Sequence, residues 1–127
     1  MKAIIGKSQK TVTTAKTAKA LGSGTLEVLA TPALVALMEE AACNAIQHLL
    51  KENQTTVGTQ ISVDHLAATP VGMDVWAQAT MIEKQGRKYV FEMQAFDEKE
   101  LIATGHHQRV EVDSERFLKK ASTKKEA

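Results

Sequence analysis

The chain has 127 residues, of which 24% are charged, and its formal net charge is +1. This balance excludes the strongly basic surface typical of nucleic-acid binding, and no apolar run approaches the ~20 residues of a membrane-spanning helix. Its one cysteine, Cys43, excludes an intramolecular disulfide. We therefore expect one domain, residues 1–127, in the reducing cytoplasm, without nucleic-acid or membrane partners.

The segment before the most apolar stretch predicts one strand and one loop. Residues 4–14 include a β-prone run and predict the first strand. Residues 15–30 show no clear periodicity and contain Gly22, Ser23 and Gly24, which predicts a loop or a mobile flap.

Residues 31–51, TPALVALMEEAACNAIQHLLK, predict a long helix that ends near residues 52–54. Thr31 is a suitable N-cap, and Pro32 suits the first helical position because its missing N–H would have no partner there. Apolar side chains recur at intervals of three and four residues and predict one buried stripe: Val35, Met38, Ala42, Ala45, Ile46 and Leu49.

Glu39 lies inside this stripe, whereas Glu40 falls on the polar line with Asn44, Gln47 and Lys51. A carboxylate against an apolar face loses hydration and must find a partner or hold a proton, and such residues cluster at functional sites. The alternative is that Glu39 lies at the edge of the stripe and reaches water, or forms a structural pair at a subunit contact.

Four strands are predicted after the helix, in residues 55–66, 71–83, 88–96 and 101–113, followed by a lysine-rich tail from about residue 116 that forms a short helix or frays. This order indicates an α+β fold. Because the helix is apolar over a wide arc, we expect the five-stranded antiparallel sheet to wrap around it. Pairing of two chains through an edge strand would cover the exposed sheet edge.

Several short pieces of sequence occur together in this chain: Ala-Thr-Pro-Ala at 30–33, Glu39, Gly58, His65, Pro-Val-Gly at 70–72, and Gly105 with Arg109. Their combination resembles the hotdog-fold thioesterases, in particular the branch typified by fluoroacetyl-coenzyme A thioesterase. The resemblance runs from about residue 24 to residue 116. It implies an acyl-CoA thioesterase that works without metal or organic cofactor, as a homodimer or as a tetramer of two dimers.

By this resemblance, Thr31, Glu39 and His65 match the catalytic residues of the family, Gly58 matches a glycine whose N–H can approach the thioester oxygen, and Arg109 matches a late arginine of the active-site region. Each has a plainer interpretation. Thr31 could only cap the helix, and His65 could be a core-edge residue bonded to backbone. Gly58 could mark a β-bulge, and Arg109 could lie on the surface.

Glu39 could attack the thioester directly or act as a general base on water. His65 shares strand parity with Ile61 and Val63, so its imidazole should face the helix layer, where it could bond Glu39 or the reacting group and transfer a proton. Eight residues of helix separate Thr31 from Glu39 by ~12 Å along the axis, so we expect them to meet across a dimer interface. His106 and His107 are adjacent on a strand, point to opposite faces, and do not predict a metal site.

Residues 15–25 contain no aromatic side chain, although a lid for a small fluorinated acyl group would be expected to carry bulky ones. A short-chain, small or aromatic acyl-CoA is therefore the expected substrate. Two alternatives remain at this stage, namely a non-catalytic acyl-CoA or small-acid binding protein and a dehydratase on the same fold.

Overall fold

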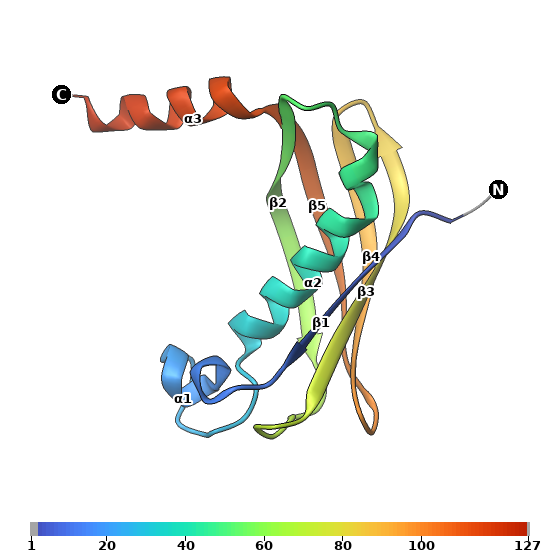
Figure 1. Ribbon diagram of the computed structural model, residues 1–127, viewed down its shortest axis with the longest axis vertical. Coiled ribbons are helices and arrows are strands. Elements are labelled where there is room, and N and C mark those ends of the chain that lie inside the picture. The colour runs from blue at the N-terminus through green and yellow to red at the C-terminus, as the bar shows by residue number, and fades with distance from the viewer. Residues whose placement is uncertain (1–2, 127) are drawn as a thin grey trace.

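The computed structural model describes residues 3–126 and contains one antiparallel sheet with strand order β1-β3-β4-β5-β2 (Figure 1). The last four strands fall close to their predicted positions, while β1 is shorter than predicted. The strands are β1 (Ile5–Thr11), β2 (Gln54–His65), β3 (Asp74–Gln85), β4 (Lys88–Asp97) and β5 (Leu101–Asp113).

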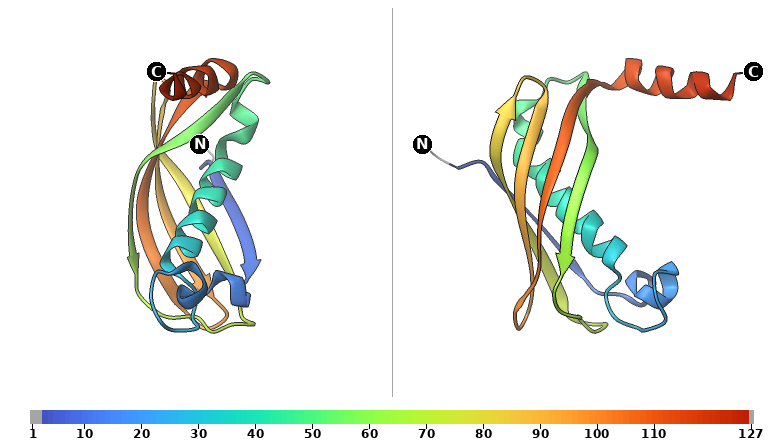
Figure 2. Two further views of the ribbon diagram at one scale, coloured as in Figure 1. Left: turned by 90° about the vertical axis from the view of Figure 1, so that its left-hand side faces the viewer. Right: turned by 180° about the vertical axis from the view of Figure 1, so that it is seen from behind.

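Helix α2 (Thr31–Ile46) lies in the concave face of the curled sheet, so the predicted arrangement of a sheet wrapped around one central helix is confirmed (Figure 2). The core between them is closed by alternate side chains of β4, Tyr89, Phe91, Met93 and Ala95, as their spacing predicts. In residues 3–126, no helix is long and apolar enough to cross a membrane.

Close contacts with β1 fix α2 against the sheet. Gly6 lets the strand backbone approach the helix, because a Cβ at this position would lie 2.7 Å from the Cα of Ala45. The Ser8 hydroxyl donates to the Leu37 carbonyl at 2.7 Å, and the Asn44 amide donates to the Lys7 carbonyl at 2.7 Å. Strand β2, at the opposite edge of the sheet, contacts α2 much less, so that edge stays open.

The buried stripe of α2 is rotated relative to its predicted position. Val35 is only half-buried, and Leu49 is exposed because α2 ends at Ile46 and a 3-10 turn (Gln47–Leu49) follows. Glu39 therefore lies at the edge of the stripe, on the side that faces β2. The residues of α2 that are buried are Leu34, Leu37, Met38, Ala41, Ala42, Ala45 and Ile46.

The predicted N-cap is wrong by one residue. Ala30 occupies the N-cap position without a side-chain hydrogen bond, and Thr31 is the first helical residue. The Thr31 hydroxyl is therefore free to bond elsewhere. Residues 15–30 are more ordered than a plain loop, since they contain α1 (Ala18–Leu21) and are tied to their surroundings by β-bridges between Thr17 and Leu29 and between Val28 and Pro70.

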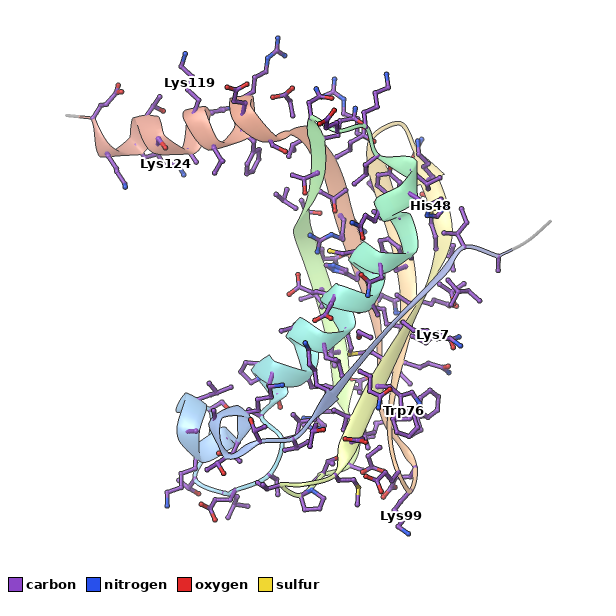
Figure 3. All side chains as sticks on the ribbon, in the orientation of Figure 1. Lys7, His48, Trp76, Lys99, Lys119 and Lys124 are labelled. Atoms are coloured by element: carbon purple, nitrogen blue, oxygen red, sulfur yellow. The ribbon has the colours of Figure 1, made fainter. Side chains whose placement is uncertain are left out.

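The lysine-rich tail forms a helix, α3 (Ser114–Ser122), which is capped by the Asp113 carboxylate and projects from the end of β5 away from the sheet (Figure 1). Lys119 and Lys124 lie in this projecting part of the chain (Figure 3).

Candidate active site

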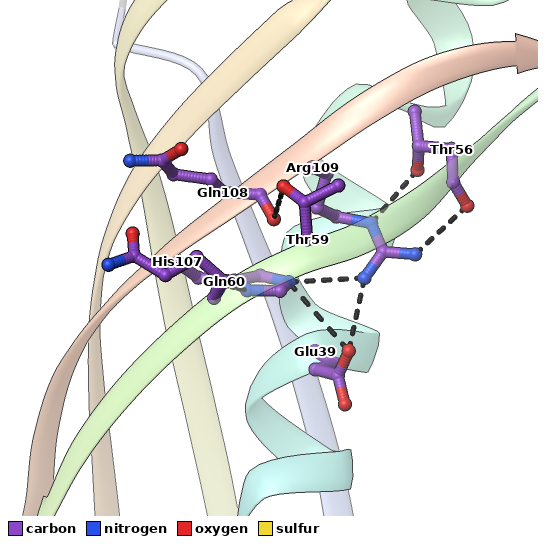
Figure 4. Close-up of polar contacts among 7 residues, drawn as sticks. All are labelled: Glu39, Thr56, Thr59, Gln60, His107, Gln108 and Arg109. Carbon is purple, nitrogen blue, oxygen red and sulfur yellow. Dashed lines mark hydrogen bonds and ion pairs between the residues drawn. The ribbon is translucent and has the colours of Figure 1, made fainter.

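Glu39 leaves α2 toward the inner faces of β2 and β5, where it meets two side chains of β5 (Figure 4). Its Oε2 lies 3.3 Å from Nη1 of Arg109 and 3.9 Å from Nε2 of His107. The Glu39 side chain is 38% exposed, so the prediction that apolar neighbours enclose it is wrong. The apolar stripe passes beside it, and its immediate neighbours are polar.

Arg109 is a buried cation whose nitrogens all have partners. Nε donates to the Thr56 hydroxyl at 2.9 Å and Nη2 donates to the Thr56 carbonyl at 3.0 Å. Nη1 donates to Glu39 and lies 3.1 Å from Nε2 of His107. A guanidinium is stable in a buried place only when it is paired and hydrogen-bonded in this way. The structure therefore excludes the surface position considered for Arg109.

His107 is 1% exposed and contacts Nη1 of Arg109, the same nitrogen that donates to Glu39. Its Nδ1 lies 2.8 Å from the Gln60 carbonyl, and its ring stacks near Phe91 with centroids 6.1 Å apart. Burial lowers the pKa of His107; the Gln60 carbonyl and Glu39 act against this, while the Arg109 cation lowers the pKa further. As predicted, His106 points to the opposite face, where it lies 3.7 Å from Glu92.

Gly58 lies against the side chains of Glu39, His107 and Arg109, and its missing side chain leaves room for them. A Cβ at Gly58 would lie 2.9 Å from Oε2 of Glu39 and 3.2 Å from Cε1 of His107. The sheet register shifts between Gly58 and Gln60, so the bulge considered for this glycine is confirmed. A cavity of about 270 Å³ lies here, lined by Glu39, Gly58, Thr59, Gln60, Ile61 and His107.

A second polar pair lies at the start of α2. The Thr31 hydroxyl and Nδ1 of His65 are 2.8 Å apart, which links the first residue of the helix to the last residue of β2. Nε2 of His65 is buried and has no hydrogen-bond partner among residues 3–126. Burial lowers the pKa of His65, and the backbone of Ala67 offsets part of this.

Within one chain, the structure therefore brings the predicted residues together in two groups. Glu39, Gly58 and Arg109 form one group, and Thr31 and His65 form the other. The histidine beside Glu39 is His107, so the expectation that Glu39 faces His65 fails for a single chain. His65 does face the helix layer, as predicted from strand parity, but it meets the helix at Thr31, about two turns before Glu39.

Thr56 and His107 are site residues that the sequence reasoning missed. His107 shares strand parity with Arg109, and a spacing of two on a strand places both on one face. That signal was available. Strict alternation backward from His65 places Thr56 on the outer face, because it ignores the residue inserted at the bulge.

The two buried histidines predict a stability change with pH. Because the pKa values of both His65 and His107 are lowered on folding, the unfolded chain binds more protons than the folded chain below their usual pKa of 6.5. The stabilisation is complete above pH 6.5 and is lost as the pH falls toward the folded-state values. We expect urea denaturation to give a smaller free energy of unfolding at pH 5.5 than at pH 7.5.

The matched controls are His106→Gln and the double variant His65→Gln/His107→Gln. Removing exposed His106 should leave the difference between the two pH values unchanged, whereas the double variant should flatten it. An undiminished difference in the double variant would assign the pH effect to other groups.

Comparison with known proteins gives one consistent result. The sequence profile described as fluoroacetyl-CoA-specific thioesterase matches residues 12–115. The fluoroacetyl-CoA thioesterase of Streptantibioticus cattleyicolor is 36% identical over 98 residues, which are 77% of this chain and 70% of that protein.

Two crystal structures extend the similarity to the fold. The F36A mutant of the fluoroacetyl-CoA-specific thioesterase FlK, in complex with fluoroacetate and CoA, has a TM-score of 0.88 at 31% identity, covering 93% of this chain and 97% of that one. A hot-dog-like protein from Thermanaerovibrio acidaminovorans has a TM-score of 0.85 at 26% identity, covering 96% and 90%. The chain has the hotdog fold and belongs to the fluoroacetyl-CoA-specific thioesterase family.

Proposed function

We propose that this protein hydrolyses a short-chain acyl-CoA to the free acid and CoA, with Glu39 as the residue that acts on the thioester. The observation that carries the proposal is the placement of the Glu39 carboxylate. Oε2 is anchored by Arg109, while Oε1 makes no hydrogen bond or ion pair within the described part of the chain (Figure 4). One oxygen is thus held in place and the other is free to react.

The neighbours of Glu39 supply what thioester hydrolysis needs. The carboxylate attacks the carbonyl carbon directly or removes a proton from an attacking water. The glycine at position 58 allows a carbonyl group to approach the strand backbone, where the Gly58 N–H serves as the oxyanion donor. Arg109 holds Oε2 of the carboxylate in place and does not line the cavity.

We further propose that two chains pair along β2 and share two active sites. Three features support this arrangement: β2 is an open sheet edge, Glu39 lies beside it and is partly exposed, and buried Nε2 of His65 lacks a partner within residues 3–126. With a twofold axis between Ile61 and Ser62, antiparallel β2 strands place His65 opposite Gly58 of the partner subunit. The Thr31–His65 pair of one chain then faces Glu39 of the other and assists departure of the thiolate.

The acyl group is expected to be a short aliphatic chain. The segment beside the Thr31–His65 pair has no aromatic residue from 15 to 29, and Leu21 and Leu26 in this segment and Leu66 next to His65 are exposed apolar residues. Branched aliphatic side chains of this kind suit an aliphatic acyl group and supply no polar contact for fluorine.

A panel of acyl thioesters tests the proposed function. Purified protein is incubated with acetyl-, propionyl-, butyryl-, benzoyl- and fluoroacetyl-CoA, and free thiol is followed. We expect kcat/KM to be highest among the short aliphatic substrates and fluoroacetyl-CoA to gain less than about tenfold over acetyl-CoA. Saturable binding without thiol release would indicate a binding protein. A larger preference for fluoroacetyl-CoA would overturn the proposed substrate.

A further inference from the structure

His107 is the one fully buried titratable side chain at the site that the proposed reaction does not use. It comes from β5, points inward beside Arg109, and has polar contacts at both ring nitrogens (Figure 4). A buried imidazole is costly unless both nitrogens are satisfied, so its two partners define its protonation state.

The partner of Nδ1 is a carbonyl oxygen, that of Gln60, which can only accept a hydrogen bond. Nδ1 must therefore carry a proton. The partner of Nε2 is the Nη1 group of Arg109 at 3.1 Å, which can only donate. Nε2 must therefore present its lone pair. Both contacts are satisfied only by the neutral imidazole with its proton on Nδ1.

We infer that His107 is a positioning residue for Glu39, acting as a neutral acceptor that fixes the Arg109 guanidinium. The inference rests on the proposed function of Glu39. Thr56 holds Nε and Nη2 of Arg109, and His107 holds Nη1, the nitrogen that also contacts the Glu39 carboxylate. Without an acceptor at Nε2 of His107, Nη1 loses one of its two partners and Oε2 of Glu39 loses its fixed donor.

Protonation of His107 would undo this arrangement. An Nε2–H would face the Nη1–H groups of Arg109, two donors and two positive charges in contact. The charged side chains facing the ring are Arg109 from β5 and Glu39 from α2, while β2 contributes the Gln60 carbonyl and β4 contributes Phe91. Glu39 and the Gln60 carbonyl favour the protonated ring, but Glu39 lies farther away than Arg109, and Nδ1–H of the neutral ring already donates to the Gln60 carbonyl.

Two substitutions at His107 test the roles of its two ring nitrogens separately. The amide of an asparagine reaches about as far as Nδ1, so His107→Asn keeps a donor for Gln60 and offers Arg109 nothing. The amide of a glutamine reaches about as far as Nε2, so His107→Gln offers Arg109 an oxygen acceptor. With acetyl-CoA, we expect His107→Asn to lower kcat roughly 10- to 100-fold with KM changed less than about threefold, and His107→Gln to keep kcat within about threefold of wild type.

Equal kcat in both variants, whether high or low, or a greater loss in His107→Gln, would overturn the inference, since a purely structural histidine gives no reason for glutamine to rescue. The nitrogen-15 NMR spectrum of the wild-type imidazole gives a readout that needs no substrate. We expect the Nδ1–H neutral tautomer at pH 6.5. An imidazolium or the Nε2–H tautomer would overturn the inference even if the protein hydrolysed no thioester, whereas absent hydrolysis alone contradicts only the proposed function.

Discussion

Glu39→Gln is expected to lower kcat for acyl-CoA hydrolysis by a factor of about 1,000 or more. The substitution keeps the size of the side chain, and the amide oxygen can still accept a hydrogen bond from Arg109, so we expect the variant to fold. It removes the negative charge and the basic oxygen that attacks the thioester or activates water. The measurement is thiol release from acetyl-CoA under saturating substrate, with circular dichroism to confirm the folded state.

Glu40→Gln is the matched control because Glu40 is the next residue of the same helix. Its carboxylate is exposed and lies 4.0 Å from Nζ of Lys10, an exposed pair of little energetic weight. We expect kcat within about twofold of wild type in this variant. Equal rates for Glu39→Gln and the wild type would remove Glu39 from the chemistry, and equal losses in both variants would point to a general effect of charge on the helix.

The sequence predicted the sheet well because local patterns determine it. Burial alternates along β4 and along the first half of β3, and this alternation tells which face of each strand is buried. The wrapped arrangement also followed from the sequence, since a helix with so wide an apolar arc needs a concave cover. These inferences use neighbours along the chain and need no knowledge of what lies across the core.

The site was harder to predict because one inserted residue changes which side chains face inward. The bulge at Thr59 puts Gly58 and Thr56 on the inner face together with Ile61, whereas strict alternation separates them. Gly58 hinted at a bulge, but its position and direction depend on pairing with β5. The partners of Arg109 therefore became visible only in the fold.

The histidine that lies beside Glu39 within one chain was missed for a related reason. The likeness to known thioesterases pairs Glu39 with His65, and within one chain the helix carries these groups apart, as its rise of 1.5 Å per residue requires. His107 fills the place beside Glu39 because β5 pairs with β2 in the sheet and places His107 opposite Ile61 at that level. The argument from helix geometry that Thr31 and Glu39 cannot meet in one straight helix agrees with their separate contacts.

A mixed dimer is expected to recover activity that neither parent has. One subunit carries Glu39→Gln and the other carries His65→Gln, and each homodimer should be nearly inactive. In the mixed dimer, one site combines both substitutions, while the second combines the intact Glu39 of one chain with the intact Thr31–His65 pair of the other. We expect about half of the wild-type activity per dimer, because one of two sites is complete.

The mixed dimer can be isolated by coexpressing the two variants with different affinity tags and purifying on both, and gel filtration then confirms two chains per particle. A dimer with Glu39→Gln in both chains and the same pair of tags is the control, and it should stay inactive. If each site lies within one chain, every site in the mixed dimer lacks either Glu39 or His65, and no activity returns. Recovery therefore requires that His65, through its free Nε2, acts on a substrate held by the other subunit. Elution of the protein as a single chain on gel filtration would contradict the shared site directly.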